Sequence, residues 1–396
     1  MNKFESAQYF LKERKLDGWL LYDFHRSNEL AHRFLSIPSS HMVTRRFFYW
    51  IPVEGEPVKL VHAIEAQALD HCPGEKRIYA SWQALEEELK CLVQGKKKIA
   101  MEYGKIPYVS KVDGGTVDLV RSMGVDVVSS GDFLLYFTSV LTKKQMESQK
   151  RAATLLNQLV QGVWHWIRKA LHEKQELTEY QIQQWLLERF KEHKLITDAP
   201  PIVALNAHSA DPHFETPRHG ASKIQNGDLL LIDLWAKEET EEAIYGDLTK
   251  VAVAAIAPTL KQQEIFHLVR SAQKASIALV RERFAKKEPL QGWEVDEAAR
   301  TLIRNAGHAE HFIHRTGHNI ETHLHGSGTH MDNLEMHDTR PLLPMTCFSV
   351  EPGIYLPGEF GVRLESDVLV YKDGTVEVTG GEQDRLECLL TRYANS

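Results

Sequence analysis

The chain has 396 residues and a formal net charge of −7, with 43% hydrophobic and 26% charged residues. This length exceeds that of a usual single domain, so we expect two domains. The composition is that of a globular protein and excludes a disordered or fibrous chain. The acidic balance argues against nucleic acid as a partner, because contact with phosphates requires a basic face.

The cysteines and the start of the chain indicate a soluble protein of the cytoplasm. The cysteines are scattered and no two have the CxxC spacing of a structural zinc or redox site, which suits a reducing compartment; they are Cys72, Cys91, Cys347 and Cys388. Lys3 and Glu5 stand where a signal peptide would need an apolar run. The longest apolar stretch, residues 251–257, is far shorter than the roughly 20 residues that span a bilayer. We therefore expect no membrane association.

The first 140 residues predict an alternating α/β unit. Apolar periodicity predicts helices at 4–15, 63–70 and 114–123, and strands at 19–22, 47–53, 58–61, 99–101 and 125–128. The turn at 54–57 predicts a hairpin. This part has no phosphate loop and no cluster of metal-binding residues. Its isolated histidines are interpreted as structural or surface residues, namely His25, His32, His41, His62 and His71.

A polar junction at 142–145 separates this unit from the remainder, so we predict domains at 1–142 and 143–396. A long amphipathic helix begins at 143 and runs through Val163; its Trp164 and Trp166 are interpreted as core or interface residues. Capping boxes at 178–181 and 259–262 predict helices to about 194 and 284. A further helix at 295–306 ends before Gly307, a suitable C′ residue.

Four acidic residues lie in apolar segments that we predict as strands. Residues 228–235 and 246–253 form an expected antiparallel pair, and residues 346–353 and 361–370 follow; the acids are Asp233, Asp247, Glu351 and Glu365. Acidic residues are depleted in strand interiors, and an unpaired buried carboxylate is costly. The alternative for each acid is a turn cap or a pairing with Lys or Arg, but four such positions together indicate a shared cation.

Residues 311–325 contain five histidines, which is typical of a metal or proton-transfer site or, alternatively, of a histidine-rich surface loop. Four carboxylates with one imidazole carry a formal charge that two divalent ions would neutralise. Such ligands favour Mn²⁺, Co²⁺ or Fe²⁺, and Zn²⁺ is an alternative. Two adjacent ions can hold a bridging hydroxide as nucleophile while polarising a carbonyl.

Five short motifs resemble the metal-ligand signature of the methionine aminopeptidase, prolidase and Xaa-Pro aminopeptidase superfamily. They are Leu-Ile-Asp-Leu at Asp233, Gly-Asp-Leu-Thr-Lys at Asp247, His-Arg-Thr-Gly-His at His318, Ser-Val-Glu-Pro-Gly-Ile-Tyr at Glu351 and Gly-Val-Arg-Leu-Glu at Glu365. The neighbouring residues resemble the proline-specific branch. The resemblance implies an α/β (α+β) protein, with a creatinase/prolidase-like N-terminal α/β domain over 1–142 and a "pita-bread" catalytic domain over 143–396.

The resemblance also implies a role for each site residue. Asp233 would bind one metal, Asp247 and Glu365 would bridge two, and His318 with Glu351 would bind the other. Glu351 would also be the general base. The remaining assignments follow: His213 contacts substrate near the scissile bond, His325 stabilises the tetrahedral intermediate, Arg363 binds substrate or orients the site, and Tyr355 supports it. His314 and His323 are candidates for a supporting role, whereas His308, His311, His330 and His337 are interpreted as polar surface.

The resemblance implies a dinuclear-metal exopeptidase that cleaves Xaa-Pro bonds at the N-terminus of peptides or in dipeptides. Mn²⁺ is the ion expected first, peptides are the expected partners, and a homodimer is expected. The alternatives are another metal-dependent amidohydrolase on the same fold and a catalytically inactive peptide- or partner-binding module. A metal-free, creatinase-like activity is disfavoured because all five ligand positions are filled.

The chain departs from the family pattern near the predicted site. Asn319 follows His318 where glycine is usual, and Gly326 follows His325 where an acid is usual. We expect Asn319 to be tolerated because asparagine accepts a left-handed backbone better than most residues. The loop between the two aspartate strands is also longer than usual. These departures leave every ligand in place and concern substrate preference.

Overall fold

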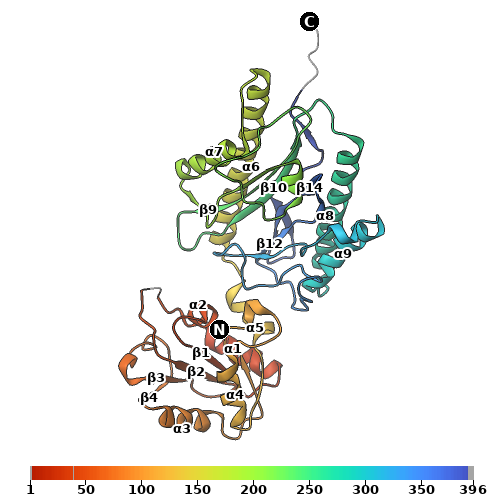
Figure 1. Cartoon of the computed structure of the whole chain (residues 1–396). Helices are drawn as coiled ribbons and strands as arrows, with labels where there is room; N and C mark the ends of the chain where they lie inside the picture. The colour runs from red at the N-terminus through yellow and green to blue at the C-terminus, as the bar shows by residue number, and fades with distance from the viewer. Residues whose placement is uncertain (1, 39, 391–396) are drawn as a thin grey trace. The chain divides into compact units, whose positions relative to one another are not determined.

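The computed structural model describes residues 2–38 and 40–390. The chain divides into two compact units, Met1–Thr138 and Ser139–Ser396. This division lies slightly before the boundary expected at 142/143, and Thr142 caps the first long helix of the second unit. Figure 1 labels the main helices and strands of the two units.

Unit 1 contains a six-stranded sheet in the order β4-β3-β2-β1-β5-β6. The strands are β1 (Gly18–Asp23), β2 (Phe47–Pro52), β3 (Val58–His62), β4 (Glu75–Tyr79), β5 (Lys98–Met101) and β6 (Asp126–Ser129). Only β2 runs antiparallel to its neighbours, and the predicted β2–β3 hairpin is present. Because β1, β3, β4, β5 and β6 are parallel, their carboxyl ends meet at one edge of the sheet.

Helices cover both faces of this sheet, so β1 and β2 are buried throughout. They are α1 (Lys3–Glu13), α2 (Glu29–Leu35), α3 (Trp82–Val93), α4 (Gly114–Ser122) and α5 (Gly131–Thr138), with short 3₁₀ turns η1 (Ala63–Glu65) and η2 (Pro107–Val109). The helix predicted at 63–70 is wrong, since only η1 and turns form there. Strand β4 was not predicted, because its sequence, Glu-Lys-Arg-Ile-Tyr, lacks the apolar pattern of a buried strand; it is a largely exposed edge strand.

Unit 2 begins with α6 (Lys143–His172) and α7 (Glu179–Glu192), and later contains α8 (Leu260–Lys286) and α9 (Gly292–Asn305). The predicted capping boxes are present at Thr178 and Thr259. Gly307 has a φ of +85° directly after α9, as expected of a C′ residue. Trp164 is buried, and Trp166 packs against Trp185 at a ring-centroid distance of 6.0 Å, so the pair belongs to the core.

The strands of unit 2 form three sheets, and β9 and β10 are the central strands of the first. The first sheet has the order β17-β10-β9-β7, with β8 also paired to β9; the second is β11-β12-β15-β16, and the third is β13-β14. Their bounds are β7 (Leu195–Ile196), β8 (Ile202–Leu205), β9 (Leu229–Glu238), β10 (Gly246–Val253), β11 (Asn319–Ile320), β12 (Thr346–Val350), β13 (Gly353–Leu356), β14 (Phe360–Arg363), β15 (Ser366–Val370), β16 (Val376–Thr379) and β17 (Glu387–Cys388). Short 3₁₀ turns lie at η3 (Asn206–Ala210) and η4 (Ala309–His311).

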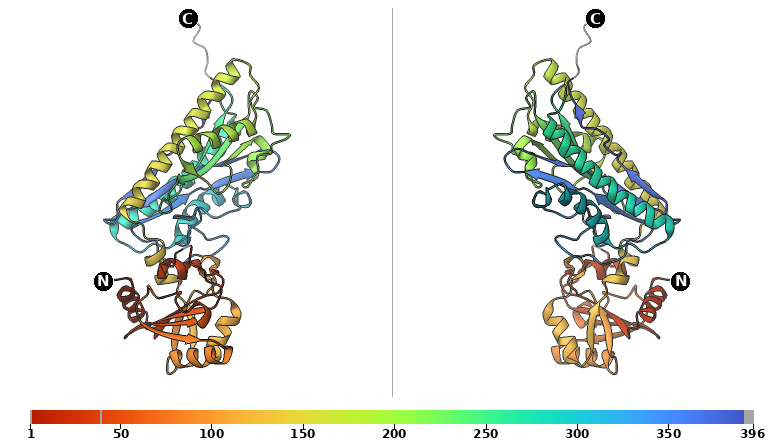
Figure 2. Two further views of the ribbon diagram at one scale, coloured as in Figure 1. Left: turned by 90° about the vertical axis from the view of Figure 1, so that its left-hand side faces the viewer. Right: turned by 90° about the vertical axis from the view of Figure 1, so that its right-hand side faces the viewer.

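The predicted pairing of β9 with β10 is confirmed, and Thr249 stands opposite Asp233 in their register. Figure 2 shows α6 along one side of unit 2 and α8 along the other. Glu351 and Glu365 do not lie within strands as predicted: Glu351 follows the end of β12, and Glu365 lies between β14 and β15. These breaks free the side chains from the strict alternation of a sheet, so both can turn toward the aspartates.

The four cysteines are free. No helix among the described residues is both long and apolar enough to cross a bilayer.

Candidate metal centre

Three of the predicted ligands form a compact buried cluster. One ligand atom from each of Asp247, His318 and Glu365 lies within 4.8 Å of the other two, and all three residues are buried. His318 Nε2 is 3.3 Å from Asp247 Oδ2 and 3.5 Å from Glu351 Oε1, which places the fourth predicted ligand beside the cluster. Segments more than 100 residues apart in sequence therefore meet at one point.

Asp233, the fifth predicted ligand, joins the group through Thr249. The Thr249 hydroxyl lies 3.0 Å from Asp233 Oδ1 and 2.7 Å from Glu365 Oε2. Asp247 and Thr249 are two residues apart on β10, so their side chains leave the same face of the strand. The pairing of β9 and β10 thereby places Asp233 beside the Thr249 hydroxyl, and the Glu365 amide, which donates to the Thr249 carbonyl at 3.1 Å, holds Glu365 against the same residue.

Contacts with Ser349 and Thr316 set the positions of His318 and Glu351. The backbone at Gly317 lies against that of Ser349, and only glycine permits this, because a Cβ at position 317 would lie 2.0 Å from the carbonyl oxygen of Ser349. The His318 amide donates to Ser349 Oγ at 3.0 Å, and Ser349 Oγ donates to Glu351 Oε1 at 3.1 Å. The Glu351 amide donates to the Thr316 carbonyl at 2.7 Å. One short segment thus holds both side chains.

Burial and mutual repulsion make this group of carboxylates unfavourable in its ionised form. Burial, and then the charges of Glu365 and Asp233, raise the pKa of Asp247 well above its ordinary value. Burial, and then Glu351 and Asp233, do the same for the pKa of Glu365. Burial raises the pKa of Glu351 to about 7 although Arg363 and Arg315 oppose it. Burial also lowers the pKa of His318, which favours the neutral imidazole that a metal requires.

This set of residues fits divalent cations. Four clustered carboxylates need positive charge to remain ionised together, and the adjacent neutral imidazole supplies a nitrogen ligand. Oxygen-rich sites with a single nitrogen suit hard or borderline ions. The residues Asp233, Asp247, His318, Glu351 and Glu365 would hold the ions.

Arg363 lies beside the predicted metal ligands, and its guanidinium donates hydrogen bonds to side chains of the protein. Its Nη2 donates to Asp233 Oδ2 at 2.5 Å, its Nε donates to Thr249 Oγ1 at 3.1 Å, and its Nη1 donates to the Tyr355 hydroxyl at 2.9 Å. Arg363 is 4% exposed. These contacts favour the orienting role over the expected substrate-binding role.

Tyr355 links Arg363 to His314. His314 Nε2 lies 2.7 Å from the Tyr355 hydroxyl, and His314 Nδ1 lies 2.7 Å from the Arg315 carbonyl oxygen. Because a carbonyl only accepts, Nδ1 carries the proton and Nε2 accepts from Tyr355. Burial, followed by the charge of Arg363, lowers the pKa of His314 to about 3. The supporting roles expected for Tyr355 and His314 agree with these contacts.

His325 and His213 lie near the cluster, on its solvent side. The His325 ring packs edge-on against His318 with centroids 4.3 Å apart, while its side chain remains accessible. Burial by surrounding residues, then the charges of Arg315 and His213, lower the pKa of His325. His213 is exposed and follows Pro212, whose carbonyl accepts from Arg363 Nη1 at 3.3 Å. Both histidines can therefore be reached by a molecule arriving from solvent.

The two departures from the family pattern contact each other. A Cβ at Gly326 would lie 2.3 Å from Asn319 Oδ1 and 2.7 Å from Glu321 Cγ. The Asn319 amide group donates to the Cys347 carbonyl at 3.0 Å and accepts from the Gly328 amide at 2.9 Å. Asn319 lies in β11 and has no positive φ, so the expected tolerance of a left-handed backbone is not what accommodates it. Its hydrogen bonds do so, and Gly326 provides the space.

Sequence reasoning missed or misplaced several supporting residues. His330 is fully buried, not on the surface, and its Nδ1 accepts from the Asn319 amide at 3.3 Å. Thr249 and Asp367 were not singled out. Asp367 is fully buried and accepts from the Asp247 amide at 2.9 Å and from Gln149 Nε2 at 2.6 Å. The sequence could have indicated Thr249 and Asp367, since each is a polar residue in an apolar strand, two positions from a predicted ligand.

Comparisons with known proteins identify a family to which the second unit is similar. The family model for "Metallopeptidase family M24" matches residues 147–372. The chain is 34% identical over 183 residues to the Xaa-Pro dipeptidase of Lactobacillus helveticus, covering 46% of this chain and 45% of that protein. It is 28% identical over 247 residues to the Xaa-Pro dipeptidase of Pyrococcus furiosus, covering 62% and 65%. The matches thus span about half to two thirds of these relatives.

Solved structures resemble the whole chain. The crystal structure of dipeptidase PepE from Mycobacterium ulcerans matches with a TM-score of 0.70 at 23% identity, covering 98% of this chain and 97% of that one. A prolidase from Thermococcus sibiricus matches with a TM-score of 0.64 at 20% identity, covering 98% of each. The expected fold, an N-terminal α/β domain followed by a pita-bread domain, is confirmed.

Proposed function

The chain belongs to metallopeptidase family M24, and we propose that it is a dinuclear-metal exopeptidase acting on Xaa-Pro bonds. The substrates would be dipeptides or the N-termini of longer peptides. The observation that carries the proposal is the convergence of Asp247, His318 and Glu365 in one buried cluster, with Glu351 and Asp233 attached to it. The names of the Lactobacillus helveticus and Pyrococcus furiosus relatives support the choice of Xaa-Pro substrates.

The proposed cofactors are two divalent ions, with Mn²⁺ first and Co²⁺, Fe²⁺ or Zn²⁺ as alternatives. When bound, such ions supply an activated water and polarise the scissile carbonyl. Asp233, Asp247, His318, Glu351 and Glu365 would hold them. Four carboxylates at one point support a pair of ions over a single one, because their combined charge exceeds that of one divalent ion.

The chain's own residues would divide the remaining work. Glu351 would take and return the proton of the attacking water at its carboxylate, for which a pKa near neutrality is suited. His325 would donate a hydrogen bond to the oxygen that becomes negative in the transition state. His213 would contact the substrate beside the scissile bond. Arg363 would keep the Asp233 carboxylate oriented through its short ion pair.

A hydrolysis assay with Mn²⁺-loaded protein tests the proposal. We expect Ala-Pro and Ala-Pro-Ala to be cleaved much faster than Ala-Ala and Ala-Ala-Ala, and Asp247→Asn to abolish cleavage. Asp384→Asn is the matched control, because this exposed aspartate pairs with Arg270 and Lys274 outside the centre. The dipeptide-to-tripeptide ratio then separates a dipeptidase from an aminopeptidase.

Three outcomes would redirect the proposal. Equal rates on proline and alanine peptides would favour a broader amidohydrolase. Absence of hydrolysis despite bound metal would favour a peptide-binding module. Wild-type activity in Asp247→Asn would overturn the assigned centre. We also propose a cytoplasmic homodimer, which sedimentation of the purified protein and fractionation of the cell would test.

A further inference from the structure

Unit 1 contains an open pocket of about 620 Å³, and none of the residues that line it is a predicted metal ligand. Its lining comes from residues 22, 24, 45–46, 62, 79–82, 113 and 116, all within unit 1. Its volume falls within the roughly 300–1,000 Å³ typical of small-molecule sites. The peptidase reaction assigns no role to this pocket.

The position of the pocket in the sheet is one that often binds ligands. Tyr22, His62 and Tyr79 stand at or next to the carboxyl ends of the parallel strands β1, β3 and β4. In open α/β sheets ligands bind outside these ends. The antiparallel strand β2 separates β1 from β3 and begins directly after Arg46, so the entry to β2 brings that residue into the same crevice.

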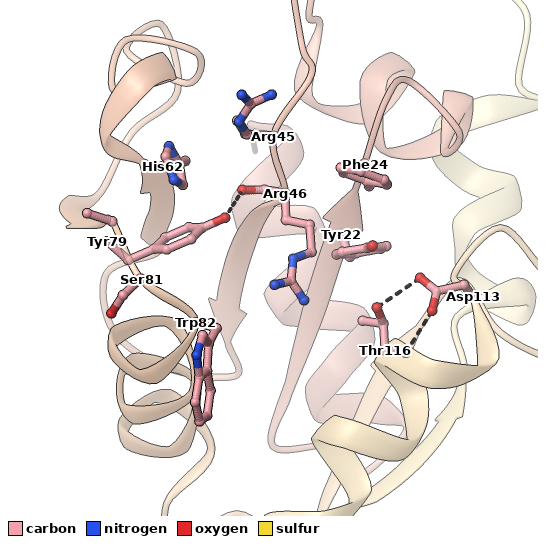
Figure 3. Close-up of a pocket in the computed structure, with 11 residues that line it drawn as sticks. Tyr22, Phe24, Arg45, Arg46, His62, Tyr79, Ser81, Trp82, Asp113 and Thr116 are labelled. Carbon is pink, nitrogen blue, oxygen red and sulfur yellow. Dashed lines mark hydrogen bonds between the residues drawn. The ribbon is translucent and has the colours of Figure 1, made fainter.

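Arg46 supplies a positive charge at the centre of the pocket. Figure 3 shows its guanidinium between Trp82 on one side and Tyr22 and Thr116 on the other. Burial raises the pKa of Tyr22 to about 12 and raises that of Tyr79, and the charge of Arg46 opposes both shifts. In the described part of the chain, no carboxylate forms an ion pair with Arg46.

Asp113, the acid that lines the pocket, is already engaged. Asp113 accepts hydrogen bonds from the amide and from the hydroxyl of Thr116, both at 2.8 Å, and so caps α4. Arg45 lines the pocket as well. Its Nη1 donates to Thr44 Oγ1 at 3.0 Å, and its charge also interacts with that of Glu65, which lies outside the lining. The pocket therefore has two guanidinium groups and one carboxylate that is committed to a helix cap.

The N-terminus of α3 adds to this positive character. Ser81 caps the helix, and Trp82 begins it. A helix of this length, twelve residues, places partial positive charge at its first turn and favours a phosphate there. Trp82 is 62% exposed and Phe24 is 43% exposed. Exposed aromatic rings beside cationic groups provide a stacking surface for a flat ring as well as a charge for an anion.

We propose that this pocket binds a small phosphorylated ligand with a planar ring, the chemistry of a nucleoside monophosphate. The phosphate meets Arg46 and the first turn of α3, and the ring stacks on Trp82. A guanidinium binds phosphate through two parallel hydrogen bonds, and aromatic stacking adds affinity independent of the base. The site shares no residue with the metal centre and does not rest on the proposed peptidase activity.

Isothermal titration calorimetry of the full chain tests the proposal, with adenosine monophosphate as the probe. We expect saturable binding at one site per chain, and at least tenfold weaker binding of adenosine and of inorganic phosphate. N-acetyltryptophan, an aromatic carboxylate, tests the other source of a ring-bearing anion and is also expected to bind at least tenfold more weakly.

Two variants locate the binding. Arg46→Met removes the charge and Trp82→Ala removes the stacking ring, and each is expected to weaken adenosine monophosphate at least tenfold. Both side chains are at least partly exposed, so neither change removes a core residue. Lys97→Met is the matched control, because this exposed lysine stands just before β5, at the opposite end of the parallel strands; it is expected to bind as wild type.

The proposal is overturned if adenosine monophosphate binds no more tightly than adenosine or phosphate. It is also overturned if N-acetyltryptophan binds as tightly, which would assign the pocket to carboxylates. Wild-type affinity in both Arg46→Met and Trp82→Ala would place any binding elsewhere. Peptidase assays of the same variants are a separate measurement, so failure of one proposal leaves the other standing.

Discussion

At the scale of single residues, the two departures from the family pattern, Asn319 and Gly326, depend on each other. Asn319 fills the space that a side chain at position 326 would need, and it satisfies two buried backbone groups. A chain that acquires Asn319 without a glycine at 326 would contain a clash next to His318. The contact explains how both family departures can occur beside the centre while all five predicted ligands keep their places.

A double-mutant cycle tests this coupling. Gly326→Ala is expected to lower the free energy of unfolding by about 1–3 kcal/mol, the usual cost of overpacking. Asn319→Gly is also destabilising, because it leaves a buried carbonyl and a buried amide unpaired. The two effects are expected to be non-additive, with Gly326→Ala costing less in the Asn319→Gly background. Strict additivity in urea unfolding would show that the two positions are independent.

At the scale of elements, α9 holds the histidine-rich segment in place. Asp296 and Arg300 form a buried ion pair one turn apart on this helix, with an Nε to Oδ2 distance of 2.7 Å. Asp296 Oδ1 accepts from the Thr316 amide at 2.8 Å, and Arg300 donates to the carbonyls of Phe312 and His314 at 3.0 and 2.8 Å. A helix that contributes no ligand thus fixes the backbone that leads to His318.

Asp296→Ala is expected to destabilise the protein by about 3–5 kcal/mol, because it leaves the Arg300 charge buried and unpaired. It should also weaken metal binding, since the segment before His318 loses an anchor. Thermal unfolding and metal titration measure the two effects. Glu282→Ala is the control, because its ion pair with Lys286 is exposed on α8. An equal decrease in the free energy of unfolding for Glu282→Ala would show that burial of the Asp296–Arg300 pair is not the cause.

The sheet of unit 1 contains a buried carboxyl group whose ionisation opposes folding. Glu102 follows β5, is fully buried, and accepts from Trp19 Nε1 at 2.5 Å, Asn28 Nδ2 at 2.9 Å and Ser130 Oγ at 3.1 Å. Burial nevertheless raises the pKa of Glu102 from 4.5 to about 7. Between these two values the folded state binds a proton that the unfolded state has released.

The stability that Glu102 contributes is therefore greatest below pH 4.5 and is lost as the pH rises toward 7. Each unit of pKa difference corresponds to about 1.4 kcal/mol. We expect the wild-type free energy of unfolding to fall from pH 5 to pH 7 relative to that of Glu102→Gln, as measured by urea unfolding at each pH. Parallel pH profiles for the two proteins would show that Glu102 is not responsible.

At the scale of the whole molecule, the sequence was most informative where the local signal was strong. The long amphipathic helix at 143, the capping boxes at Thr178 and Thr259, and the β9–β10 pair were predicted from periodicity and capping chemistry alone. The polar edge strand β4 and the helices α2, α3 and α5 were not predicted. The helix α3 was overlooked although Leu85, Leu89 and Leu92 have helical spacing. The helices α2 and α5 are short, with seven and eight residues, and their positions depend on tertiary contacts.

The same distinction applies to the centre. Acidic residues in apolar segments and a histidine motif predicted the metal ligands, and Asp247, His318 and Glu365 lie together in the structure. Three features of the centre depend on tertiary contacts. They are the ion pair of Arg363 with Asp233, the burial of His330, and the contact of Asn319 with Gly326. No local pattern encodes such contacts. The pocket around Arg46 was missed for the same reason, since its residues come from six separate segments.

The central claim is that Asp233, Asp247, His318, Glu351 and Glu365 together hold two metal ions. The most direct measurement is the metal content of protein reconstituted with Mn²⁺ and then freed of loose metal, determined by elemental analysis. We predict about two ions per chain for the wild type, as in other two-metal sites, and fewer than one for Asp247→Asn. Wild-type protein that retains no metal, or an Asp247→Asn variant that retains as much as the wild type, would contradict the claim.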